Sequence, residues 1–538
     1  MHAVLLALAI APQGPADADS VPLYDNLGDH HYAITTDVAD AQRYFDQGLR
    51  LYYAFNHAEG IRAFREAQRL DAECAMCWWG EALAWGPNIN LPMDSASGVA
   101  AWAALQGAVE RIDHANEKEG ALILALAERY EEDPPADRAR LDSAYARAMA
   151  AVAEAYPGDH EVAVLHAESE MDLRPWDYWT PEGTPAGGMS TALSRLEGVI
   201  EADQTHPGAS HFFIHAVEAV HPDRAVPCAE RLADLMPGAG HLVHMPGHIY
   251  IRVGRYIDAV RANHHAVHAD ETYIRDQRPG MGMYTAGYYP HNYDFLAFAE
   301  SMTGRSEAAM AAAEKLAELV PAEMLGQPGM GFLQHWVTRR YQMAIRYGRW
   351  NYILEQPMPD ASHRHTLAMW HYARGRALAA TGKVEEAARQ LAALREIAAD
   401  PAQQSHRLEF NTSSSVLAIA AEVLAGKVAA ARGDLDGAIR HLRQAAGHEA
   451  ALLYGEPPEW SVPVRHDLGA ALLEAGRFAE AEAVYREDLE RFRENGWALT
   501  GLMQAVEAQG RSAEAAELEA RRDAAFDEAD IELTSSAL

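Results

Sequence analysis

Small residues recur along the chain in a fixed order, and this order predicts the elements of the fold. A small residue is followed by a glycine seven positions later and by an alanine after five more, with small or apolar residues four and seven positions beyond. Alternation of polar and apolar residues, which is typical of strands, is scarce. The pattern favours paired helices that touch through small side chains. Clear copies are Gly247/Gly254/Ala259/Ala266, Gly375/Gly382/Ala387/Leu394, Gly426/Gly433/Ala438/Ala445 and Gly469/Gly476/Ala481/Tyr485, with weaker ones at Gly48/Gly60/Phe64/Ala67, Gly304/Ala309/Pro321 and Gly510/Ala515.

This spacing resembles the tetratricopeptide repeat, which places two antiparallel helices in about 34 residues. The resemblance covers most of residues 40–520 and is weakest between about 90 and 240. It implies an all-α fold, an α-solenoid of helix-turn-helix repeats, which would enclose a groove if it is curled. Such repeats usually bind peptides in a concave groove, so the repeat alone does not fix a function.

One continuous solenoid explains the 538 residues better than three or four globular domains. We divide the chain by repeat quality and by histidine content. The expected parts are an N-terminal segment 1–18, degenerate repeats 24–200, histidine-rich repeats 201–325, C-terminal repeats 326–526 and a tail 527–538 that packs on the last helices.

Composition excludes several classes of protein. The formal net charge of −33 argues against nucleic acid and anionic membranes as partners, because both need a positive surface. Three cysteines exclude a disulfide framework. We interpret Cys74 and Cys77 as helix-packing residues, and a local disulfide is the alternative if the protein is exported.

The N-terminus has a short apolar run that is too brief to span a bilayer. Its length suits a signal peptide, with Ala16-Asp17-Ala18 as a cleavage site, although a basic start is missing. A disordered N-terminus or a misplaced start is the alternative. We therefore expect a periplasmic or secreted protein, with the cytoplasm as the second choice and no membrane insertion.

Histidine is the residue that points to chemistry: eleven of the 26 lie between residues 206 and 291. His211, His215 and Glu218 follow helical spacing and share one face. Two imidazoles four residues apart are a common chelating pair, and a carboxylate beside them can be a third ligand or a general base.

A second set, His241, His244 and His248, has spacings of three and four. The repeat register places these residues, and His291 in the next copy, on the concave side of successive first helices. Pro246 conflicts with a continuous helix here, and a conflict of this kind is expected at a functional site. Alternatively, a helix begins at Pro246 and leaves His241 and His244 in a loop. The histidines at 264, 265 and 268 belong to a second helix and should face away.

We therefore predict a transition-metal site, with one or two ions of copper, iron or zinc per chain. Imidazole and carboxylate ligands suit these metals without thiolate. The predicted ligands are His211, His215, His241, His244, His248 and His291. A histidine-lined substrate pocket and a pH-sensitive patch are the alternatives.

Two further segments supply candidate catalytic residues besides Glu218. Glu168 lies on a predicted helix, and Arg174 lies where this helix ends, near Trp176. Both side chains can reach the metal. A solvated acidic helix is the alternative. Residues 279–295 form an aromatic, glycine-rich segment with Tyr289, which we expect to act as a lid or substrate wall, or simply as a loop between repeats.

The sequence thus favours a metal-dependent enzyme in the groove of a helical-repeat solenoid, leaning towards an oxidoreductase that acts on a small molecule or a peptide. A metal-dependent hydrolase is the second choice. A scaffold that binds peptides or proteins without catalysis, or a metal-storage protein, is the alternative outside enzymology.

Overall fold

The computed structural model describes residues 21–538, and all the regular structure in this range is helical apart from three isolated β-bridges. The all-α prediction is therefore confirmed. The chain forms two compact units, one from residues up to 249 with 265–289, the other from 250–264 with 290–538. The predicted signal segment 1–18 lies outside the described residues. The predicted boundaries near 200 and 325 differ from this division and stay predictions.

The first unit contains α1 (Ala39–Tyr53), α2 (His57–Leu70), α3 (Ala75–Ala84), α4 (Ser95–Glu110), α5 (Glu117–Ala127), α6 (Ala139–Ala155), α7 (His160–Asp172), α8 (Met189–Ala202), α9 (Pro207–Val217), α10 (Val226–Leu235) and α11 (Gly240–His244). The chain passes between the units within α12 (Pro246–Val253) and α13 (Tyr256–Gln277). The second unit contains α14 (Tyr289–Met302, from its second residue), α15 (Ser306–Leu319), α16 (Gly331–Trp336), α17 (Arg339–Arg346), α18 (Trp350–Glu355), α19 (Arg364–Ala380), α20 (Val384–Ala398), α21 (Ala402–Ser405), α22 (Ser413–Ala431), α23 (Leu435–Ala450), α24 (Val464–Glu474), α25 (Phe478–Arg491), α26 (Gly496–Glu507) and α27 (Ser512–Ala525).

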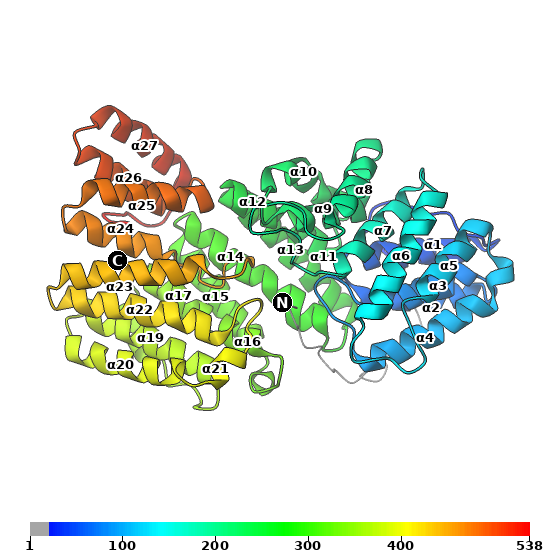
Figure 1. Ribbon diagram of the computed structural model, residues 1–538, viewed down its shortest axis with the longest axis horizontal. Helices are drawn as coiled ribbons and strands as arrows, with labels where there is room; N and C mark the ends of the chain where they lie inside the picture. The colour runs from blue at the N-terminus through cyan, green and yellow to red at the C-terminus, as the bar shows by residue number, and fades with distance from the viewer. Residues whose placement is uncertain (1–20) are drawn as a thin grey trace. The chain divides into compact units, whose positions relative to one another are not determined.

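Successive helices pack as pairs, as tetratricopeptide-like repeats do. The pairs α1/α2, α19/α20, α22/α23, α24/α25 and α26/α27 each lie side by side (Figure 1). Glycine makes the closest approaches possible: a Cβ on Gly469 would lie 2.2 Å from Cζ of Tyr485, and one on Gly501 would lie 2.1 Å from the same atom. The tyrosine ring of α25 is therefore held between the backbones of α24 and α26.

The second glycine of each sequence copy ends the first helix of a pair. Gly433, between α22 and α23, has φ 81°, which is in the left-handed region that side chains rarely adopt. Gly382 and Gly476 occupy the matching turns, with φ 78° and 70°. The repeat seen in the sequence thus reports two physical needs, close helix contact and a left-handed turn.

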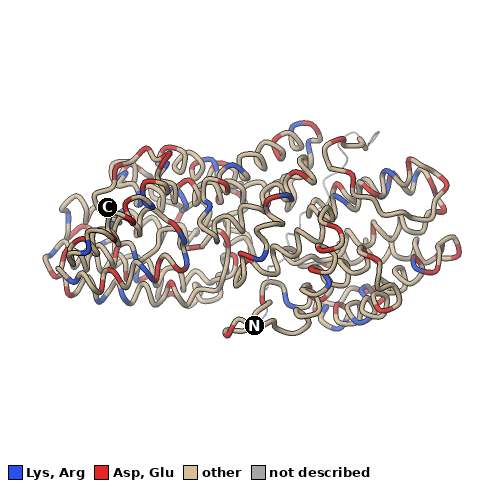
Figure 2. The backbone as a smooth tube through the Cα atoms, turned by 90° about the horizontal axis from the view of Figure 1, so that it is seen from above, with Lys and Arg blue, Asp and Glu red and all other residues tan. Residues whose placement is uncertain are grey.

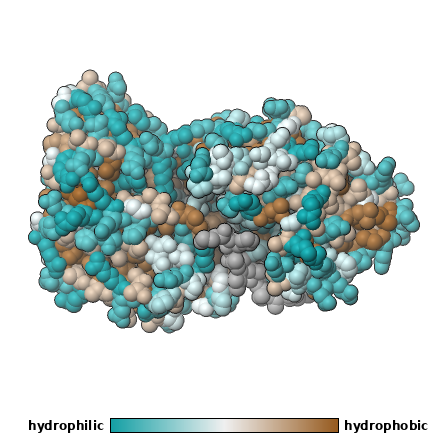
Figure 3. Space-filling view, in the orientation of Figure 1, coloured by the Kyte–Doolittle hydropathy of each residue, from teal (hydrophilic) through white to brown (hydrophobic). Residues whose placement is uncertain are grey.

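Charged residues are spread over the helices of both units (Figure 2). Acidic residues lie along the helices of both units, interspersed with lysine and arginine (Figure 2), and the face seen in Figure 3 is mostly hydrophilic. Among the described helices, α22 alone is long and apolar enough to cross a membrane, with a mean hydropathy of 1.6. It packs against α19, α20 and α23, which fits a core helix of the repeat array.

The tail after α27 packs within the second unit, as predicted. The Ser536 hydroxyl donates to the backbone oxygen of His466 at 2.9 Å and lies 2.6 Å from the hydroxyl of Tyr485. The side chain of Gln504 donates to the backbone oxygen of Thr534 at 2.9 Å.

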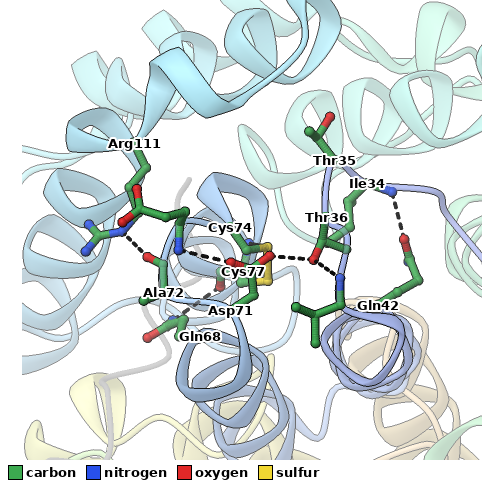
Figure 4. The surroundings of a disulfide bond; sticks show 12 residues. Ile34, Thr35, Thr36, Gln42, Gln68, Asp71, Ala72, Cys74, Cys77 and Arg111 are labelled. Atoms are coloured by element: carbon green, nitrogen blue, oxygen red, sulfur yellow. Dashed lines mark hydrogen bonds between the residues drawn. A yellow bond between two sulfur atoms is a disulfide. The ribbon is translucent and has the colours of Figure 1, made fainter.

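Cys74 and Cys77 form a disulfide at the start of α3 (Figure 4). Both cysteines are buried, and Cys74 Sγ accepts the backbone N–H of Cys77, so Cys74 caps the helix. The turn before α3 is fixed by Asp71, which accepts a hydrogen bond from Thr36. The alternative of a local disulfide is confirmed for this pair.

Candidate metal centre

Helix α9 carries two of the predicted ligands. It begins at Pro207, a residue suited to the first helical position because no N–H is needed there. The side chain of His206 caps the helix, with Nδ1 accepting the backbone N–H of Ala209 at 3.2 Å. The whole helix is buried against α1, α7, α8 and α10. It therefore holds His211 and His215 on one buried face, one turn apart.

The chain is interrupted at Pro246, between the next ligands. α11 ends at His244 and α12 begins at Pro246, because proline lacks the N–H that a continuous helix would need. A helix therefore begins at Pro246, as the alternative prediction stated. His241 and His244 nevertheless lie in the short helix α11 rather than in a loop.

Three imidazoles converge at the centre of this region. His211 Nε2 lies 3.1 Å from His241 Nε2, and ligand nitrogens of His211, His215 and His241 all lie within 4.8 Å of one another. Beside them, the Nε2 atoms of His244 and His248 are 2.9 Å apart. All five side chains are between 0 and 3% exposed and belong to the first unit. We call these five residues the histidine cluster.

Backbone and carboxylate oxygens orient two rings of the cluster. His211 Nδ1 lies 2.7 Å from the backbone oxygen of Tyr53, and His215 Nδ1 lies 3.4 Å from Oε1 of Glu218, directly after α9. Because a carbonyl or carboxylate oxygen accepts hydrogen bonds, these two contacts place the proton on Nδ1, and each Nε2 keeps a lone pair for a ligand bond. The other oxygen of Glu218, Oε2, lies 2.9 Å from His248 Nδ1.

His215 gives the clearest indication of a ligand. Its Nε2 is buried and has no hydrogen-bond partner among the described residues. Leaving a buried polar atom unsatisfied costs about 1–3 kcal/mol. A metal ion would supply the missing partner for this lone pair.

Two aromatic residues with left-handed backbones cover the histidine cluster. Phe55 has φ 55° and Trp176 has φ 66°. The Phe55 ring centroid lies 4.5 Å from that of His211 and 5.2 Å from that of His241, and Trp176 lies 5.1 Å from His215, edge to face. A bulky residue in this conformation costs about 1–3 kcal/mol, and such strain gathers at functional sites.

A short π-helical turn supplies a third aromatic wall. The sequence predicts a lid or loop over 279–295, but the structure forms a π-helix at Tyr284–Tyr288 that leads directly into α14. The ring of Tyr288 lies 4.7 Å from that of His241. Turns of this type are frequent at functional sites. The wall is therefore helical, with only its first residues in a loop.

Burial disfavours the charged form of three rings of the cluster. Burial lowers the pKa of His211, His215 and His241 well below the usual value of 6.5, and repulsion between neighbouring imidazoles lowers it further. Neutral imidazole is the form that binds metal. The same burial would make five charged rings prohibitively costly.

The other predicted catalytic residues lie outside the cluster. Glu168, on α7, accepts a hydrogen bond from the hydroxyl of Tyr52 at 2.6 Å, and burial raises the pKa of this carboxyl above its usual range. Arg174 is exposed and pairs with Asp177 at 2.5 Å. The structure does not bring either side chain into contact with the histidine rings.

Tyr289 and His291 are also placed by their helix. The hydroxyl of Tyr289 donates to Glu271 of α13 at 3.0 Å. His291 lies in α14 and belongs to the second unit, so its role as a ligand stays a prediction. The three histidines of α13, His264, His265 and His268, are exposed, and their facing away from a groove stays a prediction.

Sequence reasoning missed the contribution of α1. Its last residue, Tyr53, orients His211, and Phe55 two residues later packs on the rings of the cluster. More than 150 residues separate them from α9, and no local pattern in the sequence connects the two segments. A left-handed aromatic residue is not recognisable from composition.

No family model and no curated protein matches this chain. Several solved structures match this chain at low similarity. A human IFIT1 dimer with m7Gppp-AAAA is 11% identical, with 91% of each chain covered and a TM-score of 0.31. Yeast Tom70 is 12% identical, with 90% of this chain and 91% of that chain covered and a TM-score of 0.27. The P58(IPK) TPR domain is 12% identical, with 88% and 99% covered and a TM-score of 0.22.

Proposed function

We propose that this chain is a transition-metal enzyme whose metal is held by the histidine cluster within a tetratricopeptide-like scaffold. The convergence of ligand nitrogens from His211, His215 and His241 carries the proposal. Three such nitrogens form a familiar ligand set for copper, zinc and iron. His244 and His248 lie beside them and supply ligands for a second ion, or groups that act on a bound substrate.

Glu218 supports the proposal by its position. Its carboxylate faces the Nδ1 atoms of His215 and His248, so both rings direct Nε2 towards other groups of the cluster. We assign this carboxylate to positioning two ligands; the roles expected from the sequence, a third ligand or a general base, stay predictions.

Oxidoreductase chemistry is our preferred reaction class. Neutral nitrogen ligands suit copper and iron, which change oxidation state, and aromatic rings from Phe55, Trp176 and Tyr288 limit the access of water. The substrate would be a small molecule or a peptide. A hydrolase is the second candidate, because three histidines also bind zinc with a position left for water.

Metal analysis of the purified protein tests the proposal. Protein produced with copper, iron, zinc and nickel in the medium should carry one or two equivalents at the histidine cluster, and His215→Ala and His244→Ala should each hold less metal than the wild type. His268→Ala, on the exposed face of α13, is the matched control and should bind as the wild type does. Folding of each variant is checked by circular dichroism.

The outcomes separate the candidates. A metal-free wild type overturns the proposal and favours a binding scaffold. Bound copper or iron that ascorbate or dithionite reduces, seen by electron paramagnetic resonance, supports an oxidoreductase. Stoichiometric zinc alone overturns the oxidoreductase assignment and leaves the hydrolase.

The disulfide bears on where the protein works. Disulfides persist in oxidising compartments and are rare in the cytosol. The pair Cys74–Cys77 therefore favours our expectation of a periplasmic or secreted protein. Thiol titration of freshly isolated, denatured protein tests this, since a single reactive thiol from Cys228 is expected.

A further inference from the structure

A second group of metal-ligand residues lies in the first unit, outside the histidine cluster. His30 Nε2 and His206 Nε2 lie 3.1 Å and 3.4 Å from the same oxygen of Glu161, Oε2. Ligand atoms of the three residues all lie within 4.8 Å of one another. We call this group the open triad, because it borders a surface pocket.

The three side chains come from separate parts of the fold. His30 precedes α1, Glu161 is in the first turn of α7, and His206 caps α9. Glu161 and His206 are 3% and 1% exposed, whereas His30 is 12% exposed and opens towards solvent. The pocket has a volume of about 470 Å³ and also has Asp29, Asp159 and Asp203 on its walls. Its acidic character favours a cation, although Lys118 already neutralises Asp159 at 2.7 Å.

The second carboxylate oxygen of Glu161 is fixed by a hydrogen bond. The hydroxyl of Tyr53 donates to Oε1, so the carboxylate is oriented with Oε2 towards the two imidazoles. Orienting contacts of this kind are typical of metal ligands. His206 Nε2 has no partner within hydrogen-bond geometry among the described residues.

We propose that the open triad is a second metal site, which binds a divalent transition-metal cation through two imidazoles and one carboxylate with its remaining positions open to water. Two nitrogens and one carboxylate oxygen suit zinc or iron(II). This inference goes beyond the proposed function and does not depend on it.

One contact opposes the proposal. His206 Nδ1 accepts the N–H of Ala209, whereas a ring bound to metal through Nε2 carries a proton on Nδ1. Binding therefore breaks the cap of α9 and must provide the free energy that the cap supplied. Occupancy of the open triad would also loosen the start of the helix that carries the histidine cluster.

The test uses Zn²⁺ titration of chelator-treated full-length protein. In a His215→Ala/His244→Ala background, which removes a ligand from each part of the histidine cluster, one Zn²⁺ should still bind. Adding His30→Gln or Glu161→Gln should weaken this binding at least tenfold. His31→Gln is the matched control: this residue also lines the pocket, but its Nδ1 bonds Asp46. It should leave Zn²⁺ affinity unchanged.

His206→Asn separates the ligand from the helix cap. Asparagine caps helices well but has no imidazole, so α9 stays intact while one ligand is lost. We expect this variant to lose Zn²⁺ at the open triad and to keep its helical circular dichroism. Equal Zn²⁺ affinity in the His30, Glu161 and His206 variants and their background overturns the proposal, as does the absence of any Zn²⁺ binding in the background. Neither result bears on the histidine cluster, which is tested separately by comparing the metal content of His215→Ala with that of the wild type.

Discussion

Replacing Glu218 by glutamine tests how the rings of the histidine cluster are oriented. The carboxylate faces His248 Nδ1 at 2.9 Å and His215 Nδ1 at 3.4 Å. Glutamine keeps the size of the side chain, but it offers one oxygen in place of two and carries no charge. One ring must then face an NH₂ group with its own N–H, and it will turn or change tautomer.

The expected effect follows from the position of the carboxylate beside two ligand rings. It lies within hydrogen-bonding distance of His215 and within ion-pair distance of His248. Loss of a group that orients metal ligands costs about 10- to 100-fold in metal affinity, and we expect Glu218→Gln to lose affinity by this factor.

Competition with a chromogenic chelator measures the affinity, with zinc as the probe and with His30→Gln in every variant to weaken the open triad. Glu197→Gln is the control, because Glu197 pairs with Arg224 at the surface of the same unit. It should bind zinc as the wild type does. Unchanged affinity in Glu218→Gln would refute the orienting role. A loss as complete as that of His215→Ala would also refute it, because Glu218 would then be a ligand itself.

Three further predictions concern stability, measured as the free energy of unfolding in urea. Phe55→Ala and Phe55→Gly should each destabilise the protein by about 3–5 kcal/mol. The glycine variant should be more stable than the alanine variant by about 1 kcal/mol, because glycine tolerates the φ of 55° at this position. If the alanine variant is the more stable one, the backbone of Phe55 is not strained. Gly469→Ala should destabilise the protein by about 1–3 kcal/mol or more, because the new methyl group would clash with the ring of Tyr485. Gly447→Ala, whose new methyl group would have nothing within 4 Å, should stabilise the protein by about 0.5–1 kcal/mol. Equal effects of the two substitutions would contradict the packing argument. Burial raises the pKa of Glu449 from 4.5 to about 7, so the folded chain keeps a proton that the unfolded chain releases, and stability falls between these pH values. The stability difference between Glu449→Gln and the wild type should therefore grow by on the order of 3 kcal/mol across that window and stay constant above it; a difference independent of pH would contradict the shift.

The helical-repeat fold was predictable because its signals are local. Gly433 and its equivalents end helices wherever the chain must turn left-handed, and Gly469 stands where a ring from the next helix presses on the backbone. Each need recurs in every repeat, so it appears in the sequence as a spacing. The same regularity says nothing about how the repeats group, which is why the two units were not predicted.

The site was predictable only as far as one helix extends. His211 and His215 are joined by helical periodicity, as are His244 and His248 across Pro246. The contacts that orient them come from Tyr53, whose carbonyl approaches His211 only after distant helices have packed. The open triad escaped notice for the same reason, since its three members are single residues in three separate segments.

The energetics of the histidine cluster argue for the metal centre over a scaffold that only binds peptides. Phe55 and Trp176 are held in strained conformations at about 1–3 kcal/mol each, and the orphaned Nε2 of His215 costs a similar amount. Together these costs amount to about 3–9 kcal/mol, which is comparable to the whole stability of a typical domain. Leucine in place of His215 would fill the space without the orphaned nitrogen, and glycine at positions 55 and 176 would remove the backbone strain. A repeat protein that needed this region only for packing would gain stability from such changes, whereas a metal ion would turn the lone pair of His215 into a ligand bond.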